Sequence, residues 1–400
     1  MHVVYAWELG ANLGHLERGI AIAESLREHE ISCSFVVRDV RSSATLLSAH
    51  EFSFYAAPQC AESEFPPGRP SVSYSDVLLN VGWNNPDHLL AKVRAWTGLL
   101  ELLDADAILI DHSPVALLAA RVCDLPIFLV GTGFDVPPQQ SPLPPLLADE
   151  TSTAEQRTRS DRVVLTSINQ VLDALGHPRM ERVADLFADV PQYATTLPEL
   201  DVYGVRPNVR YLGPVLPVSK KLQPRWEIES PNRGFAYLRT HTPGFENLMD
   251  AIVSCGLDFI CVVPDATEQI IERFSSARVQ VITHTVDVVN VLGSVRLVVS
   301  YGGAALVAQS LLAGVPMLLV TRVPEQVMNS ERVVALGAGI SITRAASVNV
   351  FASALRELIE NRAYSDAAQR FAQTHTLWRP STATEIASDI ATNLHRAAVT

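Results

Sequence analysis

The sequence has few cysteines and none at metal-binding spacing. Its 400 residues include five, an odd number without a Cys-x-x-Cys pair: Cys33, Cys60, Cys123, Cys255 and Cys261. This pattern predicts neither a disulfide framework nor a zinc site. We expect reduced thiols in a cytoplasmic protein. Basic residues are also scarce, 31 Lys and Arg against 43 Asp and Glu. Nucleic acid is therefore not an expected partner, because phosphate backbones bind to a basic face.

Long hydrophobic runs are absent as well. No segment approaches the roughly 18 apolar residues of a membrane-spanning helix, so no membrane span is expected. The start, MHVVYAWELG, lacks the basic and apolar regions of a signal peptide, and none is expected. Hydrophobic residues nevertheless make up 48% of the chain and charged residues 18%. This composition supports sizeable cores, and the length fits two domains of about 200 residues each.

Short apolar runs alternate with longer helical ones along the whole chain. In the first half the predicted strands are 3–7, 34–37, 107–110 and 127–130, with helices over 16–26 and 115–122. In the second half they are 235–238, 259–263, 279–283, 297–300, 316–320 and 339–342, with a helix over 304–312. Continuous apolar strands separated by helices are typical of a parallel sheet that is covered on both faces. The sequence therefore predicts an α/β protein with two doubly wound domains.

His15 lies at the start of the first predicted helix, directly after a turn that contains Gly10, Ala11 and Gly14. A helix N-terminus disfavours the imidazolium ion, so a neutral ring that accepts a proton is favoured here. The alternative is a histidine that only caps the helix. This segment alone does not distinguish the two.

Asp111 follows the predicted strand 107–110, so it belongs to the same sheet edge as His15. A carboxylate there can bond the far nitrogen of the imidazole and stabilise its protonated form, which makes the pair a general base for a hydroxyl. The alternative for Asp111 is an N-cap of the helix over 116–122. His112 and Ser113 are weaker neighbouring candidates.

A third loop follows the strand 297–300, where Ser300 and Tyr301 lead into Gly302, Gly303 and a helix that begins at once. The glycines permit close approach of a ligand, and the helix N-terminus offers free N–H groups to a phosphate. Many such turns are only tight connections, so the motif is weak by itself.

Together these segments resemble the GT-B glycosyltransferases, in particular the bacterial family 1-like group that includes macrolide and UDP-glucuronosyl/glucosyl transferases. The likeness rests on the Gly14-His15 stretch, on Asp111, on YLGP at 211–214 and on 297–329, which contains Gly302-Gly303, AGVP, Glu325-Gln326 and Asn329. It implies two Rossmann-like domains that face each other across a cleft: 1–214 for the acceptor and 233–382 for the donor. The linker would be 215–232, and the helix 383–400 would cross back to the first domain.

The resemblance also implies an inverting, metal-independent hexosyltransferase that needs no cofactor besides its co-substrate, a nucleotide diphosphate sugar with UDP as the expected nucleotide. His15 would deprotonate the acceptor hydroxyl, with support from Asp111. The expected donor-binding residues are Arg239, Thr240, Ser300, Tyr301, Gly302, Gly303, Ala304, Gln309, Glu325 and Gln326. The expected acceptor-binding residues, for a small and hydrophobic acceptor, are Gly14, Trp83, His112 and Phe134.

This sequence departs from the family pattern at the donor end. Tyr301 stands where the family has a phosphate-binding histidine, and Gln309 where it has a ribose-binding glutamate. The Trp-x-Pro-Gln stretch has no match, and Arg239-Thr240 stands where small residues are common. Two other functions therefore remain open: a non-catalytic GT-B relative that binds a ligand or partner, and a UDP-sugar 2-epimerase. The oligomeric state is not predicted.

Overall fold

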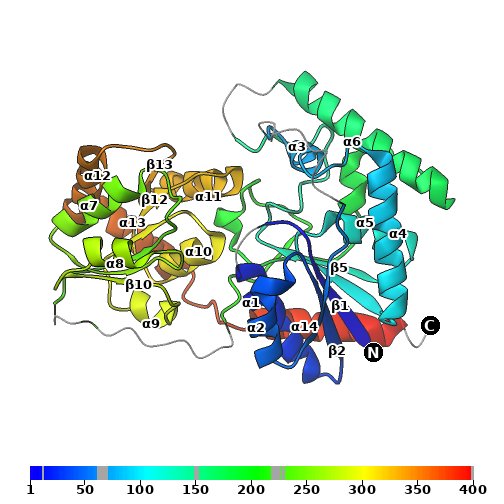
Figure 1. The fold of residues 1–400 in the computed structure, drawn as a ribbon, viewed down its shortest axis with the longest axis horizontal. Helices are drawn as coiled ribbons and strands as arrows, with labels where there is room; N and C mark the ends of the chain where they lie inside the picture. Colours follow the sequence, from blue (N-terminus) through cyan, green and yellow to red (C-terminus); the bar gives the residue numbers. More distant parts are fainter. Residues whose placement is uncertain (11–12, 61–70, 148–152, 218–225, 227–229, 398–400) are drawn as a thin grey trace. The chain divides into compact units, whose positions relative to one another are not determined.

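The structure is a computed structural model that describes residues 1–10, 13–60, 71–147, 153–217, 226 and 230–397. The chain forms two compact units (Figure 1). The N-terminal unit contains the described residues of Met1–Pro198, Tyr203–Val218 and Arg379–Thr400, and the C-terminal unit those of Glu199–Val202 and Ser219–Trp378. Most of the expected linker and Ala11 of the first turn lie outside the described residues.

The N-terminal unit is built on a parallel sheet of strand order β3-β2-β1-β4-β5-β6-β7. The four strands predicted from apolar runs are confirmed. The three that the sequence did not reveal are short, and each of them carries a polar residue. The strands are β1 (His2–Trp7), β2 (Ser32–Val37), β3 (Ser53–Ala56), β4 (Ala107–Ile110), β5 (Ile127–Gly131), β6 (Gln192–Ala194) and β7 (Arg210–Tyr211).

Helices cover both faces of this sheet (Figure 1). They are α1 (Gly14–Arg27), α2 (Val40–Ala49), α3 (Tyr74–Leu79), α4 (Pro86–Leu102), α5 (Pro114–Val122), α6 (Ala154–Leu175) and α14 (Thr382–Ala397), with short 3-10 helices at Val183–Phe187 and Pro198–Leu200. The last helix, α14, packs on α1 and buries Ile386, Ile390 and Leu394 in the same core as β1 and β2. The predicted return of the C-terminal helix to the first domain is therefore confirmed.

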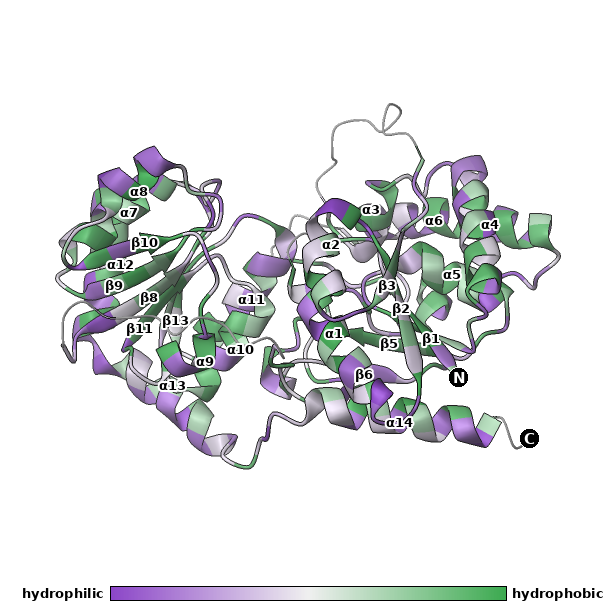
Figure 2. Ribbon diagram, turned by 60° about the horizontal axis from the view of Figure 1, so that its bottom comes forward, coloured by the Kyte–Doolittle hydropathy of each residue, from purple (hydrophilic) through white to green (hydrophobic). Residues whose placement is uncertain are grey.

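The C-terminal unit repeats the architecture with a parallel sheet of order β10-β9-β8-β11-β12-β13. The strands are β8 (Arg233–Tyr237), β9 (Asp258–Val262), β10 (Val279–Ile282), β11 (Leu297–Ser300), β12 (Met317–Val320) and β13 (Gly339–Ile342). The helices are α7 (Phe245–Ser254), α8 (Glu268–Phe274), α9 (Val288–Leu292), α10 (Ala304–Leu312), α11 (Pro324–Ala335), α12 (Val348–Glu360) and α13 (Arg362–Thr374). Figure 2 shows hydrophobic strands between these helices, as the apolar runs predicted.

Both sheets change winding direction at one place, between β1 and β4 in the first and between β8 and β11 in the second. Loops at the carboxyl ends of such neighbouring strands diverge and leave room for ligands. His15 and Asp111 follow β1 and β4, whereas Arg239 and Ser300–Ala304 follow β8 and β11. No helix among the described residues is long and apolar enough to cross a membrane.

Candidate active site

Asp111 is the centre of a hydrogen-bonded cluster at the carboxyl edge of the first sheet. Its side chain is fully buried and accepts hydrogen bonds from His15 Nδ1 at 2.7 Å and from the Tyr5 hydroxyl. Arg18 donates two more, from Nε at 2.8 Å and from Nη2 at 2.7 Å. Burial alone would favour the neutral acid, but Arg18 and His15 outweigh it and hold the pKa of Asp111 well below its usual range. The carboxylate is therefore ionised at neutral pH.

The ionised state of Asp111 determines the tautomer of His15. A carboxylate has no proton to give, so His15 Nδ1 must carry the hydrogen in the 2.7 Å bond. The other ring nitrogen, Nε2, is then unprotonated in the neutral ring and acts as a proton acceptor. The His15 side chain is 19% exposed, so it remains accessible from solvent. The pair has the composition and geometry of a general base.

The surroundings of His15 leave Nε2 uncovered on one side. The ring stacks on Trp7, with centroids 5.3 Å apart. A side chain at Gly10 would place its Cβ 2.6 Å from Nε2, and Gly10 has a φ of +89°, which non-glycine residues rarely adopt. Beneath the helix, Gly19 makes room for the Tyr5 ring, because a Cβ there would be 2.5 Å from Tyr5 Cζ. Glycine is therefore required at both positions, because any larger residue would clash with His15 at Gly10 and with Tyr5 at Gly19.

The structure gives neither His15 nor Asp111 the capping role that was the alternative. Helix α1 has Leu13 at its N-cap and no side-chain cap. Helix α5 begins at Pro114, and its first N–H groups donate to Glu8 Oε2, at 2.9 Å from Val115 and 3.3 Å from Ala116. A partly buried glutamate from the loop after β1 therefore caps α5, and Asp111 bonds His15 instead.

A second buried carboxyl group, Asp135, lies beside this cluster. It follows β5, and a Cβ at Gly131 would be 2.3 Å from its Oδ2. Burial raises the pKa of Asp135 to about 6, and the negative charge of Asp111 adds to the effect. The two carboxyl groups thus differ: Asp111 stays ionised, while Asp135 exchanges a proton near neutral pH.

His112, next to Asp111, is held in an unusual state. Its φ is +48°, a left-handed value for a non-glycine residue. Burial, together with the charge that His15 carries when it is protonated, lowers the pKa of His112 to about 3. The His112 ring also packs edge-on against Phe134, with centroids 6.1 Å apart, and both line the aromatic cluster around Tyr74. These two predicted acceptor contacts therefore lie together, and the ring of one of them, His112, has its centroid 6.3 Å from that of His15.

The other two predicted acceptor contacts lie differently. Trp83 is fully buried, so in this structure its ring packs in the core and presents no surface to a ligand. Its role as an acceptor contact stays a prediction, and its burial follows from the free energy that a large apolar side chain gains on leaving water. Gly14 is the exposed first residue of α1, with nothing within 4 Å of the position of a Cβ.

In the C-terminal unit the loop after β11 has the tight geometry that its glycines predicted. Gly302 has a φ of +87°, and a Cβ there would be 3.1 Å from the Gln326 carbonyl oxygen. Its N–H donates to Ser300 Oγ at 3.1 Å, and its carbonyl accepts from Asn329 Nδ2 at 3.0 Å. Gly303 is the N-cap of α10 and provides no side-chain cap. The first turn of α10, from Ala304, therefore keeps its backbone donors for an anion.

Tyr301 lies near two of the other predicted donor residues, Arg239 and Glu325. Burial raises the pKa of its hydroxyl, so the group is neutral at pH 7. The charges of Arg239 and Glu325 lie near enough to act on that pKa in opposite directions. Arg239 is therefore the local positive group beside the residue that replaces the family's histidine.

The remaining predicted donor residues have defined local roles. Gln326 Oε1 accepts a hydrogen bond from Arg322 N at 3.0 Å and so caps α11. Thr240 donates to Asp265 Oδ2 at 2.7 Å and lines an open pocket of about 450 Å³ with Gly244 and Asn247. Gln309 lies in the second turn of α10 and is partly exposed.

Sequence reasoning missed Arg18, Asp135 and Glu8. One signal existed for Arg18, which is three residues after His15 and hence on the same face of the helix. Asp135 and Glu8 act on residues that the tertiary fold brings to them, and their local sequence carries no comparable signal.

The opposite pKa shifts of Asp135 and His112 predict opposite effects of pH on stability. Asp135 binds a proton more readily in the folded chain, so it favours folding increasingly as pH falls from about 6 towards 4, by about 3 kcal/mol. His112 binds one less readily, so it lowers stability as pH falls below about 6.5. From pH 7 to pH 5, Asp135→Asn should lose stability more steeply than the unmodified protein, and His112→Asn less steeply. Urea unfolding followed by tryptophan fluorescence measures both, and parallel pH profiles for all three proteins would contradict the assignment.

Comparisons with known proteins agree with this architecture. Residues 246–392 match the family described as "Erythromycin biosynthesis protein CIII-like, C-terminal domain". The "PGL/p-HBAD biosynthesis glycosyltransferase" of Mycobacterium tuberculosis (strain ATCC 25177 / H37Ra) is 27% identical over 193 residues, which cover 47% of this chain and 43% of that protein. The match thus spans less than half the length of this curated relative.

Two solved structures are similar over nearly the whole chain. The calicheamicin glycosyltransferase CalG4 has a TM-score of 0.71 at 16% identity, covering 99% of this chain and 98% of its own. The glycosyltransferase VinC, in complex with dTDP, has a TM-score of 0.68 at 15% identity, covering 99% and 100%. The chain is thus a GT-B fold protein that resembles the family 1-like glycosyltransferases. More particularly, residues 246–392, which include most of the C-terminal unit, match the erythromycin CIII-like C-terminal domain family.

Proposed function

We propose that this protein is an inverting glycosyltransferase that transfers a sugar from a nucleotide diphosphate sugar to a hydroxyl group of a small acceptor. The observation that carries the proposal is the His15–Asp111 pair, in which Nδ1 is bonded at 2.7 Å and Nε2 is left as the proton acceptor. The glycosyltransferases CalG4 and VinC share this fold, and VinC was solved with dTDP. The donor nucleotide is accordingly a pyrimidine nucleotide, UDP or dTDP.

The reaction follows from the chemistry of the two residues. His15 Nε2 takes the proton of the acceptor hydroxyl while its oxygen forms a bond to the anomeric carbon of the sugar. The bond from that carbon to the diphosphate oxygen breaks with its electron pair, and attack from the opposite face inverts the configuration. Asp111 stabilises the imidazolium that forms, and the stacked Trp7 ring adds a cation–π contribution. His15 then returns the proton to solvent.

The loop after β11 is the proposed diphosphate site. The uncapped N-terminus of α10 favours a negative group through its N–H donors and its dipole. Gly302 and Gly303 allow a phosphate to approach the backbone closely. Arg239 supplies the positive charge that Tyr301, a neutral donor, does not.

Titration calorimetry with UDP, dTDP and GDP tests the donor half of the proposal. Binding of UDP or dTDP is expected, and slow hydrolysis of the corresponding nucleotide-glucose should release the diphosphate. Binding without hydrolysis would favour a ligand-binding GT-B protein. Two observations motivate this alternative: Tyr301 stands where the family pattern has a histidine, and Gln326 Oε1 already accepts a hydrogen bond from Arg322 N. Failure of all three nucleotides to bind would contradict the transferase.

Gly10→Ala tests the accessibility of Nε2. The new methyl group would lie 2.6 Å from that atom, so the imidazole must move. Because small misplacements of a reacting group can cost about 100-fold in rate, a loss of that order in donor hydrolysis is expected with unchanged nucleotide affinity. Gly176→Ala is the matched control, because Gly176 also has a positive φ, +75°, and nothing lies within 4 Å of its new Cβ. Equal hydrolysis rates for the two variants would show that Nε2 is not the reacting atom.

A further inference from the structure

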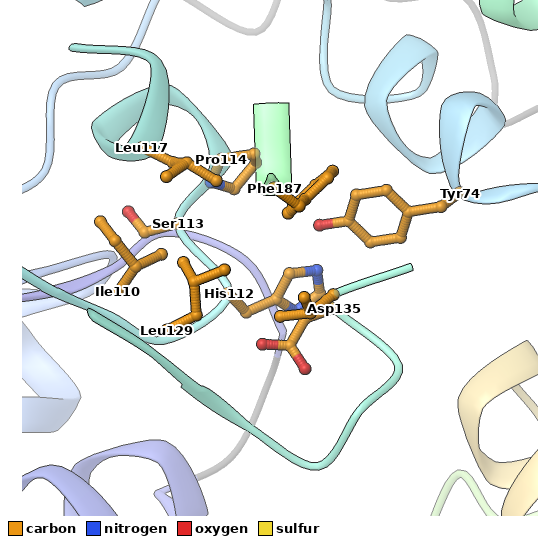
Figure 3. Close-up of a pocket in the computed structure, with 10 residues that line it drawn as sticks. Tyr74, Ile110, His112, Ser113, Pro114, Leu117, Leu129, Asp135 and Phe187 are labelled. Carbon is orange, nitrogen blue, oxygen red and sulfur yellow. The ribbon is translucent and has the colours of Figure 1, made fainter. Parts of the chain in front are cut away.

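Beside the candidate base lies a small cavity that the proposed mechanism does not use. Its volume is about 10 Å³, and its lining includes Tyr74, His112, Asp135 and Phe187 (Figure 3). This volume corresponds to one water-sized probe and is too small for a sugar or a nucleotide. Its occupant must therefore be a single small group.

Among the described residues that line this cavity, three buried polar atoms lack hydrogen-bond partners: Tyr74 OH, His112 Nε2 and Ser113 Oγ, of which Ser113 lies near enough to Glu8 to act on its pKa. Tyr74 OH and His112 Nε2 are buried, and neither bonds any residue of the described part of the chain. Tyr74 is 1% exposed and His112 is 9% exposed. Figure 3 shows the Tyr74 hydroxyl directed toward the His112 ring. Buried polar atoms of folded proteins are nearly always paired, so these two indicate a missing partner.

The chemistry of the two atoms restricts that partner. Tyr74 is a neutral phenol, since burial raises its pKa well above the ordinary value, and His112 is a neutral imidazole at pH 7. Each offers hydrogen bonding without charge, and a neutral His112 Nε2 either donates or accepts. Asp135 also lines the cavity, and the positive charge of Arg18 acts against the negative charge of its carboxyl group. The cavity therefore suits a neutral group that both donates and accepts, which is an O–H.

We propose that this cavity is a single-oxygen site, in which one neutral oxygen is hydrogen-bonded between Tyr74 OH and His112 Nε2. The oxygen is that of a water molecule or of a hydroxyl group on a ligand. The cavity lies next to the proposed base, since the His15 and His112 rings have centroids 6.3 Å apart. A ligand whose hydroxyl group binds in the cavity would therefore lie near His15. If the proposed function holds, an acceptor with two hydroxyl groups would present one to His15 and the other here.

The aromatic walls determine what kind of ligand carries that hydroxyl. Phe187, which lines the cavity, and Phe134, which lies behind the lining residues, pack edge-on against Tyr74, with centroids 5.8 and 6.1 Å from its ring. Rings in this arrangement favour a planar apolar body with a polar substituent at its edge. A phenolic compound with a second hydroxyl group is the simplest probe with these properties.

The first experiment is a crystal structure of the ligand-free protein at a resolution that shows ordered water, with Tyr74→Phe and a control variant. A water within hydrogen-bond distance of both atoms is expected in the unmodified protein and absent in Tyr74→Phe. Tyr193→Phe is the matched control, because its hydroxyl bonds Asp389 on α14 and not this cavity. A cavity without density, or a direct bond between His112 and Tyr74, would overturn the proposal.

The sign of the stability change provides an independent test. A hydroxyl that bridges to a water or ligand is stabilising, so Tyr74→Phe should lower the urea midpoint of unfolding. If the hydroxyl were simply unsatisfied, its removal would relieve a desolvation cost and raise the midpoint. A raised midpoint in Tyr74→Phe would therefore contradict the site even where the structure is not solved.

Calorimetric titrations with phenol, catechol, resorcinol and hydroquinone distinguish the two sources of the oxygen. Preference for one diphenol over phenol by about threefold to tenfold, lost in Tyr74→Phe, supports a ligand hydroxyl, because one net hydrogen bond has that effect. A bound water together with equal affinities supports water as the sole occupant. Both readouts measure binding and need no turnover, so they stand apart from a failure of the transferase itself.

Discussion

His15→Ala is expected to reduce donor hydrolysis and sugar transfer by about 100-fold to 10,000-fold, the usual contribution of a positioned general base. Nucleotide affinity should not change, because His15 belongs to the N-terminal unit and the proposed diphosphate loop to the C-terminal unit. The measurement combines initial rates of diphosphate release with calorimetric affinity for the same nucleotide. His29→Ala, just past the end of α1, is the control for loss of a histidine from this segment.

Asp111→Asn separates the two members of the pair. An amide at this position can donate to Nδ1 and so favours the ring tautomer with hydrogen on Nε2, which cannot accept a proton. A loss similar to that of His15→Ala is expected, and the double variant should be no worse than either, since the two residues act as one unit. Additive losses, or a hydrolysis rate equal to that of the unmodified protein in His15→Ala, would rule out the base assignment.

Arg18→Met is expected to have the largest effect on stability. Arg18 supplies two of the hydrogen bonds to Asp111 and bonds Thr195 Oγ1 at 3.0 Å, all in a buried site. Its removal leaves a buried carboxylate without its main positive partner, which typically costs about 3–5 kcal/mol. Urea unfolding at pH 7 measures the change in the free energy of unfolding.

The pH dependence of that variant follows from the same contact. In the unmodified protein the depressed pKa of Asp111 stabilises the fold above the ordinary aspartate pKa, and this contribution is lost only in acid. Without Arg18 the carboxyl should titrate at higher pH, so the deficit of Arg18→Met should shrink as pH falls. Adding Asp111→Asn should recover part of the loss at pH 7. The control is Arg179→Met, whose ion pair with Asp173 is exposed and should contribute little.

Much of the fold was predictable because it depends on local patterns. Strands such as β4 and β11 are short apolar runs buried on both faces. In the segments that flank them in the sequence, hydrophobic residues repeat with the spacing of a helix. The weak strands β6 and β7 were not predictable, because three and two residues of mixed polarity form strands only by pairing with an existing sheet edge. Similarly, Trp83 had two interpretations until its burial became visible.

The sequence by itself determined the two doubly wound sheets, the place of His15 and Asp111 at carboxyl strand ends, and the glycine turn before α10. These follow from hydrophobic period and residue order, which are properties of neighbouring residues. Only the tertiary structure decided that Arg18 and Tyr5 share Asp111 with His15, that Glu8 caps α5, and that Tyr74 meets His112 at a cavity. The physical reason is that these contacts join residues up to 108 positions apart, and their energies depend on burial and charge that no local pattern records.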